Sequence, residues 1–321
     1  MTNNKGIYRE FCKIQKDIPI FSKDWWLDSV CGLDGWNVAI VQKGGEIVAS
    51  MPYVVTKKHG FDVIYMPQFT QTMGSYIVYP ENQQYYKRLS WEKELMSELI
   101  DNLPNFDHFE QNFHSRITNW LPFYWKGFKN TTKYSYRIPS IKNIQEVFNN
   151  FAHSKRKNIN KAKNIVDIKF DLSCDEFYKN HEMTLKKQKA QISYTKETFE
   201  NIYNNAYANN SGRTIYAIDK DGNIHGALFV IWDNESAYDL ISTIDPDFRN
   251  SGAASLLVYK MIEYVSSFVD IFDFEGSMIE YVENSFRQFG AIQTPYFTIS
   301  KTNSRLYELL HFTKNFLRSN A

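Results

Sequence analysis

The stretch YDLISTIDPDFRNSGAASLLVYKMIEYV, residues 238–265, decides the fold that we expect. Residues 238–244 are rich in β-branched and aromatic side chains, as strands are. Asp245-Pro246 ends this strand, because proline has no N–H to donate to a ladder. Apolar residues then recur at the spacing of one buried helix face, at Ala254, Leu257, Val258, Met261, Ile262 and Val265. A strand, a loop and a helix therefore follow one another, as in an α/β protein.

The loop itself is built from small and polar residues. A strand that runs through such a loop into a helix leaves backbone N–H groups unpaired at the helix start. Together with the helix dipole these groups form a site for an anion, typically a phosphate or pyrophosphate. The alternative is an ordinary β-to-α turn without a ligand. The residues that would form the anion site are Arg249, Asn250, Ser251, Gly252, Ala253 and Ala254. Gly252 would let the backbone approach the ligand closely.

The composition is that of an ordinary globular protein. Of its 321 residues, 43% are hydrophobic and 23% are charged, and the net charge of +1 provides no field that would attract DNA. The three cysteines have no C-x-x-C spacing, which argues against a zinc site or a disulfide framework. No apolar run is long enough to span a bilayer and no signal peptide is evident, so we expect a cytoplasmic location.

The remaining chain divides into two halves that repeat one order of elements. In each half a glycine-containing turn joins two apolar strands, at Lys43-Gly44-Gly45 and at residues 219–223. In each half a helix then leads to a strand of similar sequence, FDHFE at 106–110 and FDFE at 272–275. This repetition predicts duplication of one α/β unit, with units at residues 1–140 and 141–321.

The R-x-x-G-x-A pattern at residues 249–254 resembles the acyl-CoA pyrophosphate loop of the GNAT acyltransferase superfamily. Two such units, only the second with the loop, resemble the Fem-type family of peptidoglycan bridge-forming transferases and polysaccharide acetyltransferases. The resemblance covers residues 25–300 and includes FDFEGS at 272–277 and FRQFG at 286–290. It implies an α/β (α+β) fold of two tandem GNAT-like units, each a mixed, mostly antiparallel sheet flanked by helices.

The resemblance also implies a donor site. The strand before the loop would supply backbone groups for the pantetheine arm and the acyl carbonyl, through Ile241, Ser242, Thr243 and Ile244. The next strand would separate from it and leave a slot. Acetyl-CoA or another acyl-CoA would be the co-substrate, and no metal is implied.

Acyl transfer to an amine needs a base for the amine proton. Glu275, on the strand after the helix, is the candidate, and Asp273 is the alternative. Strand alternation places both carboxyl groups on one face, where one could raise the pKa of the other. Both could instead be solvated or hold a salt bridge.

The helix after this strand departs from the usual pattern. In GNAT proteins it often carries a tyrosine that acts as general acid to the leaving thiol, and this chain has Phe286 there. A thiolate can leave without help, because the pKa of a thiol is only about 8.5. The neighbouring Arg287 could hold an anionic part of the donor or acceptor, or lie on the surface.

The polar loop at residues 66–74 of the first unit is a candidate acceptor site. Gln68, Thr70 and Gln71 carry amide and hydroxyl groups that can hydrogen-bond a sugar or a peptide. Alternatively, these groups satisfy the backbone of their own loop.

These observations predict an N-acyltransferase that moves an acyl group, in first place acetyl, from acyl-CoA to an amine. The acceptor expected from the resemblance is an amino sugar of a cell-surface polysaccharide precursor, free or linked to a carrier. Two alternatives stay open: a Fem-type transferase that takes its acyl group from aminoacyl-tRNA, and a catalytically silent binding module.

Overall fold

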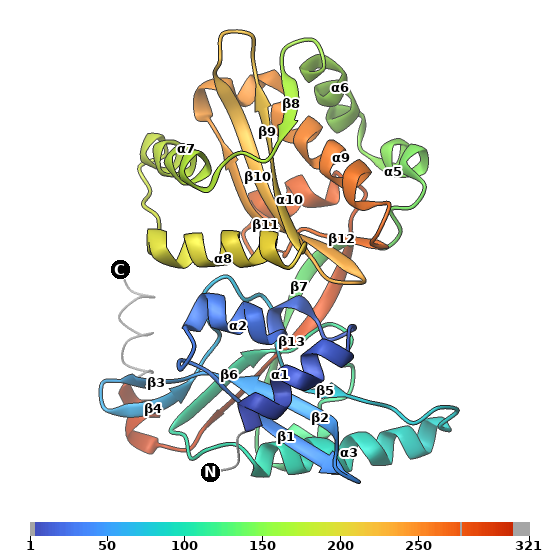
Figure 1. Cartoon of the computed structure of the whole chain (residues 1–321), viewed down its shortest axis with the longest axis vertical. Helices are drawn as coiled ribbons and strands as arrows, with labels where there is room; N and C mark the ends of the chain where they lie inside the picture. Colours follow the sequence, from blue (N-terminus) through green and yellow to red (C-terminus); the bar gives the residue numbers. More distant parts are fainter. Residues whose placement is uncertain (1–3, 277, 311–321) are drawn as a thin grey trace. The chain divides into compact units, whose positions relative to one another are not determined.

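The computed structural model describes residues 4–276 and 278–310 and shows two α/β units (Figure 1). The first unit comprises residues 4–133 and 295–310, and the second comprises Tyr134–Thr294. The predicted division put everything after residue 140 into the second unit. The structure returns the chain to the first unit from Pro295 onwards, because Thr298–Thr302 pair with Asn112–His108 in an antiparallel ladder.

The first unit holds two groups of strands with helices packed on them. One group has the order β1 (Asn37–Lys43), β2 (Glu46–Tyr53), β5 (Tyr76–Ile77), all antiparallel. The other has the order β3 (Val55–Lys58), β4 (Phe61–Ile64), β6 (His108–Asn112), β13 (Ile292–Thr302). The helices of this unit are α1 (Asn4–Ile14), the 3-10 turn η1 (Ile20–Ser22), α2 (Asp24–Cys31), α3 (Tyr85–Asp101) and α4 (Leu121–Trp125).

The second unit is built on one sheet. Its strands have the order β7 (Lys129–Ile138), β12 (Ile271–Asp273), β11 (Ser236–Ile244), β10 (Ile224–Trp232), β9 (Gly212–Ile218), β8 (Asp167–Phe170). All neighbours are antiparallel except β11 and β12. The helices are α5 (Ile144–Asn150), α6 (His153–Ala162), α7 (Cys174–Lys187), α8 (Lys196–Ala208), the 3-10 helix η2 (Pro246–Ser251), α9 (Ala253–Val265) and α10 (Glu280–Arg287).

Strand β10 shows how the sheet of the second unit is covered on both faces. Leu228 and Val230 belong to the core that includes α9, whereas the ring of Phe229 contacts Phe177 of α7 and Phe199 of α8. Successive side chains of a strand point to opposite faces. A strand that is buried on both faces therefore reads as a continuous apolar run, here GALFVIW at residues 226–232.

The predicted fold class is confirmed: both units are mixed, mostly antiparallel sheets flanked by helices. Each unit also contains one short parallel pair at a corresponding place. β4 pairs with β6 at Val63–His108 and Ile64–Phe109, and β11 pairs with β12 from Ser236–Ile271 to Tyr238–Asp273. A helix follows the first strand of each pair in the chain, α3 in one case and α9 in the other.

Candidate active site

The loop between β11 and α9 is a 3-10 helix rather than an irregular turn. The Asp245 carboxylate accepts the backbone N–H of Asp247 at 3.0 Å, which starts η2. Lys187 of α7 donates to Asp245 at 2.7 Å and to Asp247 at 2.6 Å. Lys187 thus offsets one of the two negative charges of the loop, and Arg249, which is exposed, provides a second positive charge.

Gly252 is required here for a different reason from the one predicted. Its φ of +84° lies in the left-handed region, and a Cβ added to it would stand 2.3 Å from the carbonyl oxygen of Asn158 in α6. The sequence suggested that this glycine lets a ligand approach the backbone. The structure shows that it lets helix α6 approach the start of α9. Lys161 of α6 also donates to the Asn250 carbonyl at 2.6 Å.

The remaining predicted loop residues are divided between exposed and buried positions. Asn250 is exposed, Ser251 and Ala253 are buried, and Ala254 is half-buried. Ser251 Oγ accepts the backbone N–H of Ala253 at 3.2 Å, so this hydroxyl caps the helix. Exposed and half-buried positions at the start of α9 are thus where an anion could approach.

Strands β11 and β12 part within the second unit. In the described residues their parallel ladder ends at Tyr238–Asp273, whereas β11 continues to Ile244 and pairs there only with β10. A bulge lies at the same point: Phe229 pairs with Ile241 and Val230 with Asp239, so Leu240 is an extra residue. Bulges re-aim the side chains beside them. Among the described residues, β11 is therefore not paired with β12 from Asp239 onwards.

Asp273 is the last residue of β12 and is fully engaged. Ser135 Oγ and the backbone N–H of Glu275 donate to its Oδ1, the latter at 2.8 Å. Arg137 Nε lies 3.2 Å from Oδ2. Burial raises the pKa of Asp273, and the Arg137 guanidinium opposes that rise. These contacts suit Asp273 to holding the strand end in place rather than to taking a proton.

Glu275 lies beyond the end of β12, so strand alternation does not apply to it. Its backbone is left-handed, with a φ of +59°. Burial raises the pKa of Glu275 well above its ordinary value, and the charges of Asp273 and Asp239 raise it further. A carboxyl group with a raised pKa is suited to general-base work near neutral pH.

Asp239 is a third carboxylate at this place, and the sequence analysis missed it. Burial raises its pKa to about 6, opposed by the Ser242 hydroxyl, which donates to both carboxylate oxygens at 2.9 Å. The available signal was a single acidic residue inside an apolar strand. Without the bulge, nothing distinguished it from a solvated residue.

The other predicted donor residues are placed on β11 as expected. Ser242 is exposed and Ile241 is buried, and both precede the half-buried Ile244. Thr243 is buried and its hydroxyl lies 2.6 Å from that of Thr184 on α7. The Thr243 side chain therefore fastens α7 to the sheet and leaves only the backbone of this residue for a ligand.

Phe286 and Arg287 lie on α10. Phe286 packs against Phe274 with ring centroids 4.9 Å apart, so it is a core contact. Arg287 is bonded within its own helix, to Asn284 at 3.0 Å and to Glu283 at 3.5 Å. Ser277, part of the motif that carried the resemblance, lies outside the described residues.

The predicted acceptor residues of the first unit have mixed surroundings. Thr70 is buried; it accepts Trp26 Nε1 at 3.0 Å and donates to the Gln68 carbonyl at 3.1 Å. The Gln71 carbonyl accepts Asn112 Nδ2 at 3.0 Å. The Thr70 hydroxyl thus bonds the backbone of its own loop, while the Gln68 side chain is exposed.

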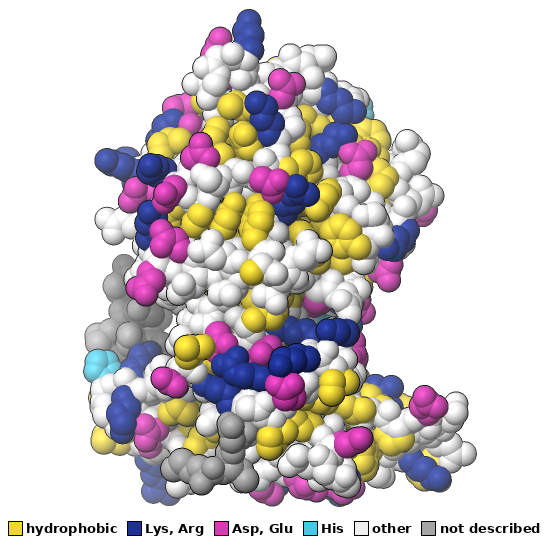
Figure 2. Space-filling view, viewed as in Figure 1, with side chains coloured by type: hydrophobic (Ala, Val, Ile, Leu, Met, Phe, Trp, Pro, Cys, Tyr) yellow, Lys and Arg dark blue, Asp and Glu magenta, His cyan; other side chains and the backbone are white. Residues whose placement is uncertain are grey.

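Two further observations concern partners. In residues 4–276 and 278–310, no helix is both long and apolar enough to cross a membrane, and no cluster of three or more His, Cys, Asp or Glu side chains could hold a metal. On the face shown in Figure 2, acidic and basic side chains are interspersed.

Comparison with known proteins assigns the second unit. Residues 150–276 match the family model of the GNAT acetyltransferase domain. The fold over 92% of the chain resembles FemX, with a TM-score of 0.67, 13% identity and 96% of FemX covered. No curated protein matches the sequence.

Two other solved structures are similar in fold. One is the C-terminal domain of a putative lysylphosphatidylglycerol synthetase from Agrobacterium fabrum, with a TM-score of 0.54, 9% identity and coverage of 92% of this chain and 95% of that one. The other is L-PGS from Bacillus licheniformis, with a TM-score of 0.53 and 9% identity. The similarity covers 90% of this chain and 91% of that one. Residues 150–276 are therefore a GNAT acetyltransferase domain, within a chain whose fold resembles that of FemX.

Proposed function

We propose that this protein transfers an acyl group, in first place acetyl, from acyl-CoA to the amine of a sugar that is destined for a cell-surface polysaccharide. The observation that carries the proposal is the position of Glu275. It lies where β11 and β12 part, with Asp239 and Asp273 close enough to raise its pKa further.

The chemistry follows from that position. The nitrogen of the acceptor attacks the thioester carbonyl, a C–N bond forms and the C–S bond breaks. The Glu275 carboxylate takes the proton that the nitrogen loses. CoA leaves as a thiolate, which needs no acid because of its modest basicity. The role of Phe286 as a core contact is compatible with this route.

The donor would lie along the open edge of β11, with its pyrophosphate at the start of α9. A helix start attracts anions through its dipole and its backbone N–H groups. Arg249 and Asn250 are exposed beside it, and Lys187 and Arg249 together balance the negative charges of Asp245 and Asp247. Loop charge therefore does not oppose the approach of a phosphate.

A second candidate differs in the donor. One of the similar structures is named as a putative lysylphosphatidylglycerol synthetase, and that name indicates an aminoacyl product. With an aminoacyl ester of tRNA as donor, Glu275 would again accept the proton that the acceptor nitrogen loses. The net charge of +1 favours the smaller donor, because binding to nucleic acid depends on neutralising many phosphates.

The test is acetyl-CoA binding by calorimetry to the wild type, to Arg249→Glu and to Lys220→Glu. Both residues are exposed in the second unit, but Lys220 lies on the hairpin between β9 and β10. We expect saturable binding that the change at Arg249 weakens about tenfold or more and the change at Lys220 leaves intact. Failure of the folded wild type to bind any acyl-CoA, together with transfer from aminoacyl-tRNA, would favour the second candidate.

A further inference from the structure

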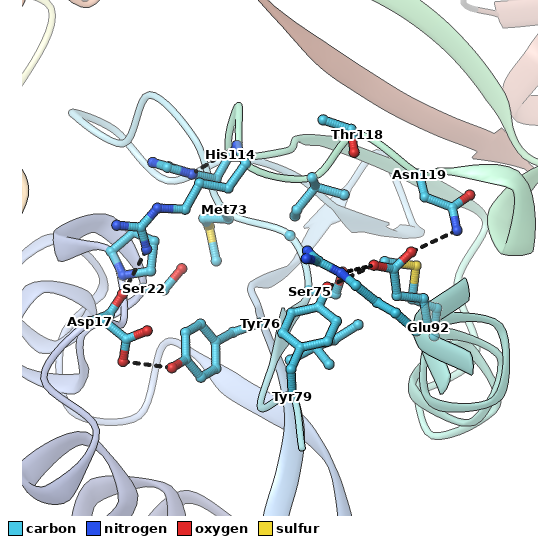
Figure 3. Close-up of a pocket in the computed structure, with 17 residues that line it drawn as sticks. Asp17, Ser22, Met73, Ser75, Tyr76, Tyr79, Glu92, His114, Thr118 and Asn119 are labelled. Atoms are coloured by element: carbon cyan, nitrogen blue, oxygen red, sulfur yellow. Dashed lines mark hydrogen bonds and ion pairs between the residues drawn. The ribbon is translucent and has the colours of Figure 1, made fainter. Parts of the chain in front are cut away.

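The first unit contains a pocket that none of the predicted residues line. Its volume is 370 Å³, within the range of sites for small molecules. Its wall runs through Met73–Ile77, the start of α3 and the loop at residues 114–119 (Figure 3). The pocket begins two residues after Gln71, so the polar loop predicted for the acceptor leads into it.

Ser75 provides the first sign that the pocket receives a ligand. This residue is only 7% exposed, lines the pocket, and among the described residues its Oγ has no hydrogen-bond partner. A buried hydroxyl without a partner is unfavourable and is rarely retained in a folded protein. A group that enters the pocket and accepts or donates a hydrogen bond would satisfy it.

One wall of the pocket is held rigid by Glu92 of α3, which is 5% exposed. Its Oε1 accepts the Tyr79 hydroxyl at 2.9 Å and Arg88 Nε at 3.1 Å, and its Oε2 accepts Asn119 Nδ2 at 2.8 Å. The Arg88 guanidinium also lies over the Tyr79 ring, 4.1 Å from its centroid. Figure 3 shows Glu92 between these groups. Such a wall is preorganised, so little ordering entropy is lost on binding.

The opposite wall, like that of Arg88 and Glu92, carries one carboxylate and one guanidinium group. The Tyr76 hydroxyl donates to Asp17 Oδ1 at 2.7 Å, and Arg116 Nη1 donates to the Asp17 carbonyl at 3.1 Å. The pocket is therefore lined by two guanidinium groups and two carboxylates. Since these charges sum to zero, the pocket favours an uncharged polar ligand over a phosphate or a nucleotide.

Both apolar and polar side chains line the pocket. The rings of Tyr76 and Tyr79 and the side chains of Met73 and Ile117 offer flat or apolar contact. Hydroxyl, amide and guanidinium groups stand between them on several sides. A sugar ring has the matching chemistry: two faces of C–H groups and a rim of hydroxyls, each of which donates and accepts.

We propose that this pocket binds the ring of a hexose or hexosamine through its hydroxyl groups, with the Ser75 hydroxyl as one of the partners. The inference rests on the proposed function only in identifying this sugar with the acyl acceptor. Sugar binding to the first unit is a separate property that requires no acyl donor.

The test is saturation-transfer NMR of the full chain with D-glucosamine, N-acetylglucosamine and UDP-N-acetylglucosamine, and with inorganic phosphate and UDP as competitors. Thr118→Trp places a large side chain at the exposed rim of the pocket, and Thr131→Trp is the matched control on an exposed position of β7 in the same unit. We expect transfer to the sugar ring protons in the wild type and in Thr131→Trp, and its loss in Thr118→Trp. Ser75→Ala should weaken binding about three- to tenfold while the protein stays folded.

Three results would overturn the proposal. These are no sugar binding at tens of millimolar, sugar binding that Thr118→Trp leaves unchanged, and displacement of the sugar by UDP or phosphate alone. Sugar binding without any acyl transfer would sustain the pocket and reject the proposed function, whereas acyl transfer to a sugar in Thr118→Trp at the wild-type KM would reject the pocket alone.

Discussion

At the residue scale the molecule concentrates buried carboxyl groups where β11 and β12 part. Glu275 is the one whose pKa is raised by burial and by two neighbouring charges, while Asp273 is committed to Arg137. A base must be ionised to accept a proton. Activity that depends on Glu275 should therefore rise with pH as this carboxyl loses its own proton.

We expect Glu275→Gln to lower kcat by about 10²- to 10⁴-fold, because a positioned base contributes that much. The acid limb of the pH profile of kcat/KM should disappear with it. Steady-state rates with acyl-CoA from pH 5 to 9 test this, with circular dichroism to verify folding. An unchanged acid limb in Glu275→Gln would assign the base elsewhere.

Asp239→Asn should move the acid limb to lower pH. The Asp239 charge disfavours ionisation of Glu275, so removing that charge lowers the pKa of Glu275. The amide keeps an oxygen that can accept from Ser242, which limits the structural change. A limb that moves to higher pH would contradict this coupling.

The same substitution should change how stability depends on pH. The Asp239 carboxyl has a pKa of about 6 in the folded protein, above its ordinary value of 3.8. Its contribution is fully present below pH 3.8 and is lost as the pH rises through 6, because the folded state holds the proton more tightly. The free energy of unfolding of Asp239→Asn relative to wild type should therefore increase by up to about 3 kcal/mol between pH 4 and pH 7. Urea titrations at both pH values measure it.

At the element scale, the contact between α6 and the start of α9 requires that residue 252 has no Cβ atom. Gly252 and Gly222 have nearly the same backbone, with φ of +84° and +86°, but nothing lies within 4 Å of a Cβ added to Gly222. Gly222→Ala should cost about 1 kcal/mol for the left-handed backbone. Gly252→Ala should cost about 1–3 kcal/mol more, because its methyl group meets the Asn158 carbonyl.

Thermal or urea unfolding of the two alanine variants provides the comparison. If both variants lost the same free energy of unfolding, α6 would move to accommodate the methyl group without destabilising the protein. The pair also separates the structural need for Gly252 from any role in binding CoA, because Arg249 can be changed without touching α6.

Strong patterns made some elements predictable and left others out. The spacing of apolar residues in α9 and the apolar run of β10 were sufficient, since both elements are buried along their length. Helix α6 has little apolar pattern, because among its ten residues just Ile159 and Ala162 are buried. Strand β12 was predicted to reach Glu275 but ends at Asp273, since the left-handed backbone of Glu275 depends on tertiary contacts.

The candidate site was predictable only in part. Glu275 and Asp273 followed from a short acidic pattern that matched a known family. Asp239 did not, because its position depends on a bulge, and a bulge is a property of the pairing between two strands. The pocket around Ser75 was also missed, since it unites segments more than 40 residues apart, and no local pattern marks such a meeting.

At the scale of the whole molecule, the chain leaves the first unit within β7 and returns to it within β13. Ile299 is fully buried in the core of the first unit, although it lies near the end of the chain. Ile299→Ala should therefore destabilise the first unit by about 2–5 kcal/mol. Hydrogen exchange should rise in β1 and β2 and stay unchanged in β9 and β10.

Ile215→Ala is the matched control, since Ile215 is fully buried in the core of the second unit. It should give the reverse pattern, with faster exchange in β9 and β10. If both variants accelerated exchange throughout the chain, the two units would unfold as one.

The return of β13 has a consequence for how the protein is made. The ribosome delivers β1 to β6 first, yet the ladder partner of β6, at residues 298–302, emerges only after β7 to β12. Every strand of the second unit's sheet has therefore been synthesised by then. The second unit can therefore complete its sheet while the first still has an open strand edge at β6. An open edge is a place where chains associate wrongly, so the nascent first unit is the part of this protein that most needs a chaperone.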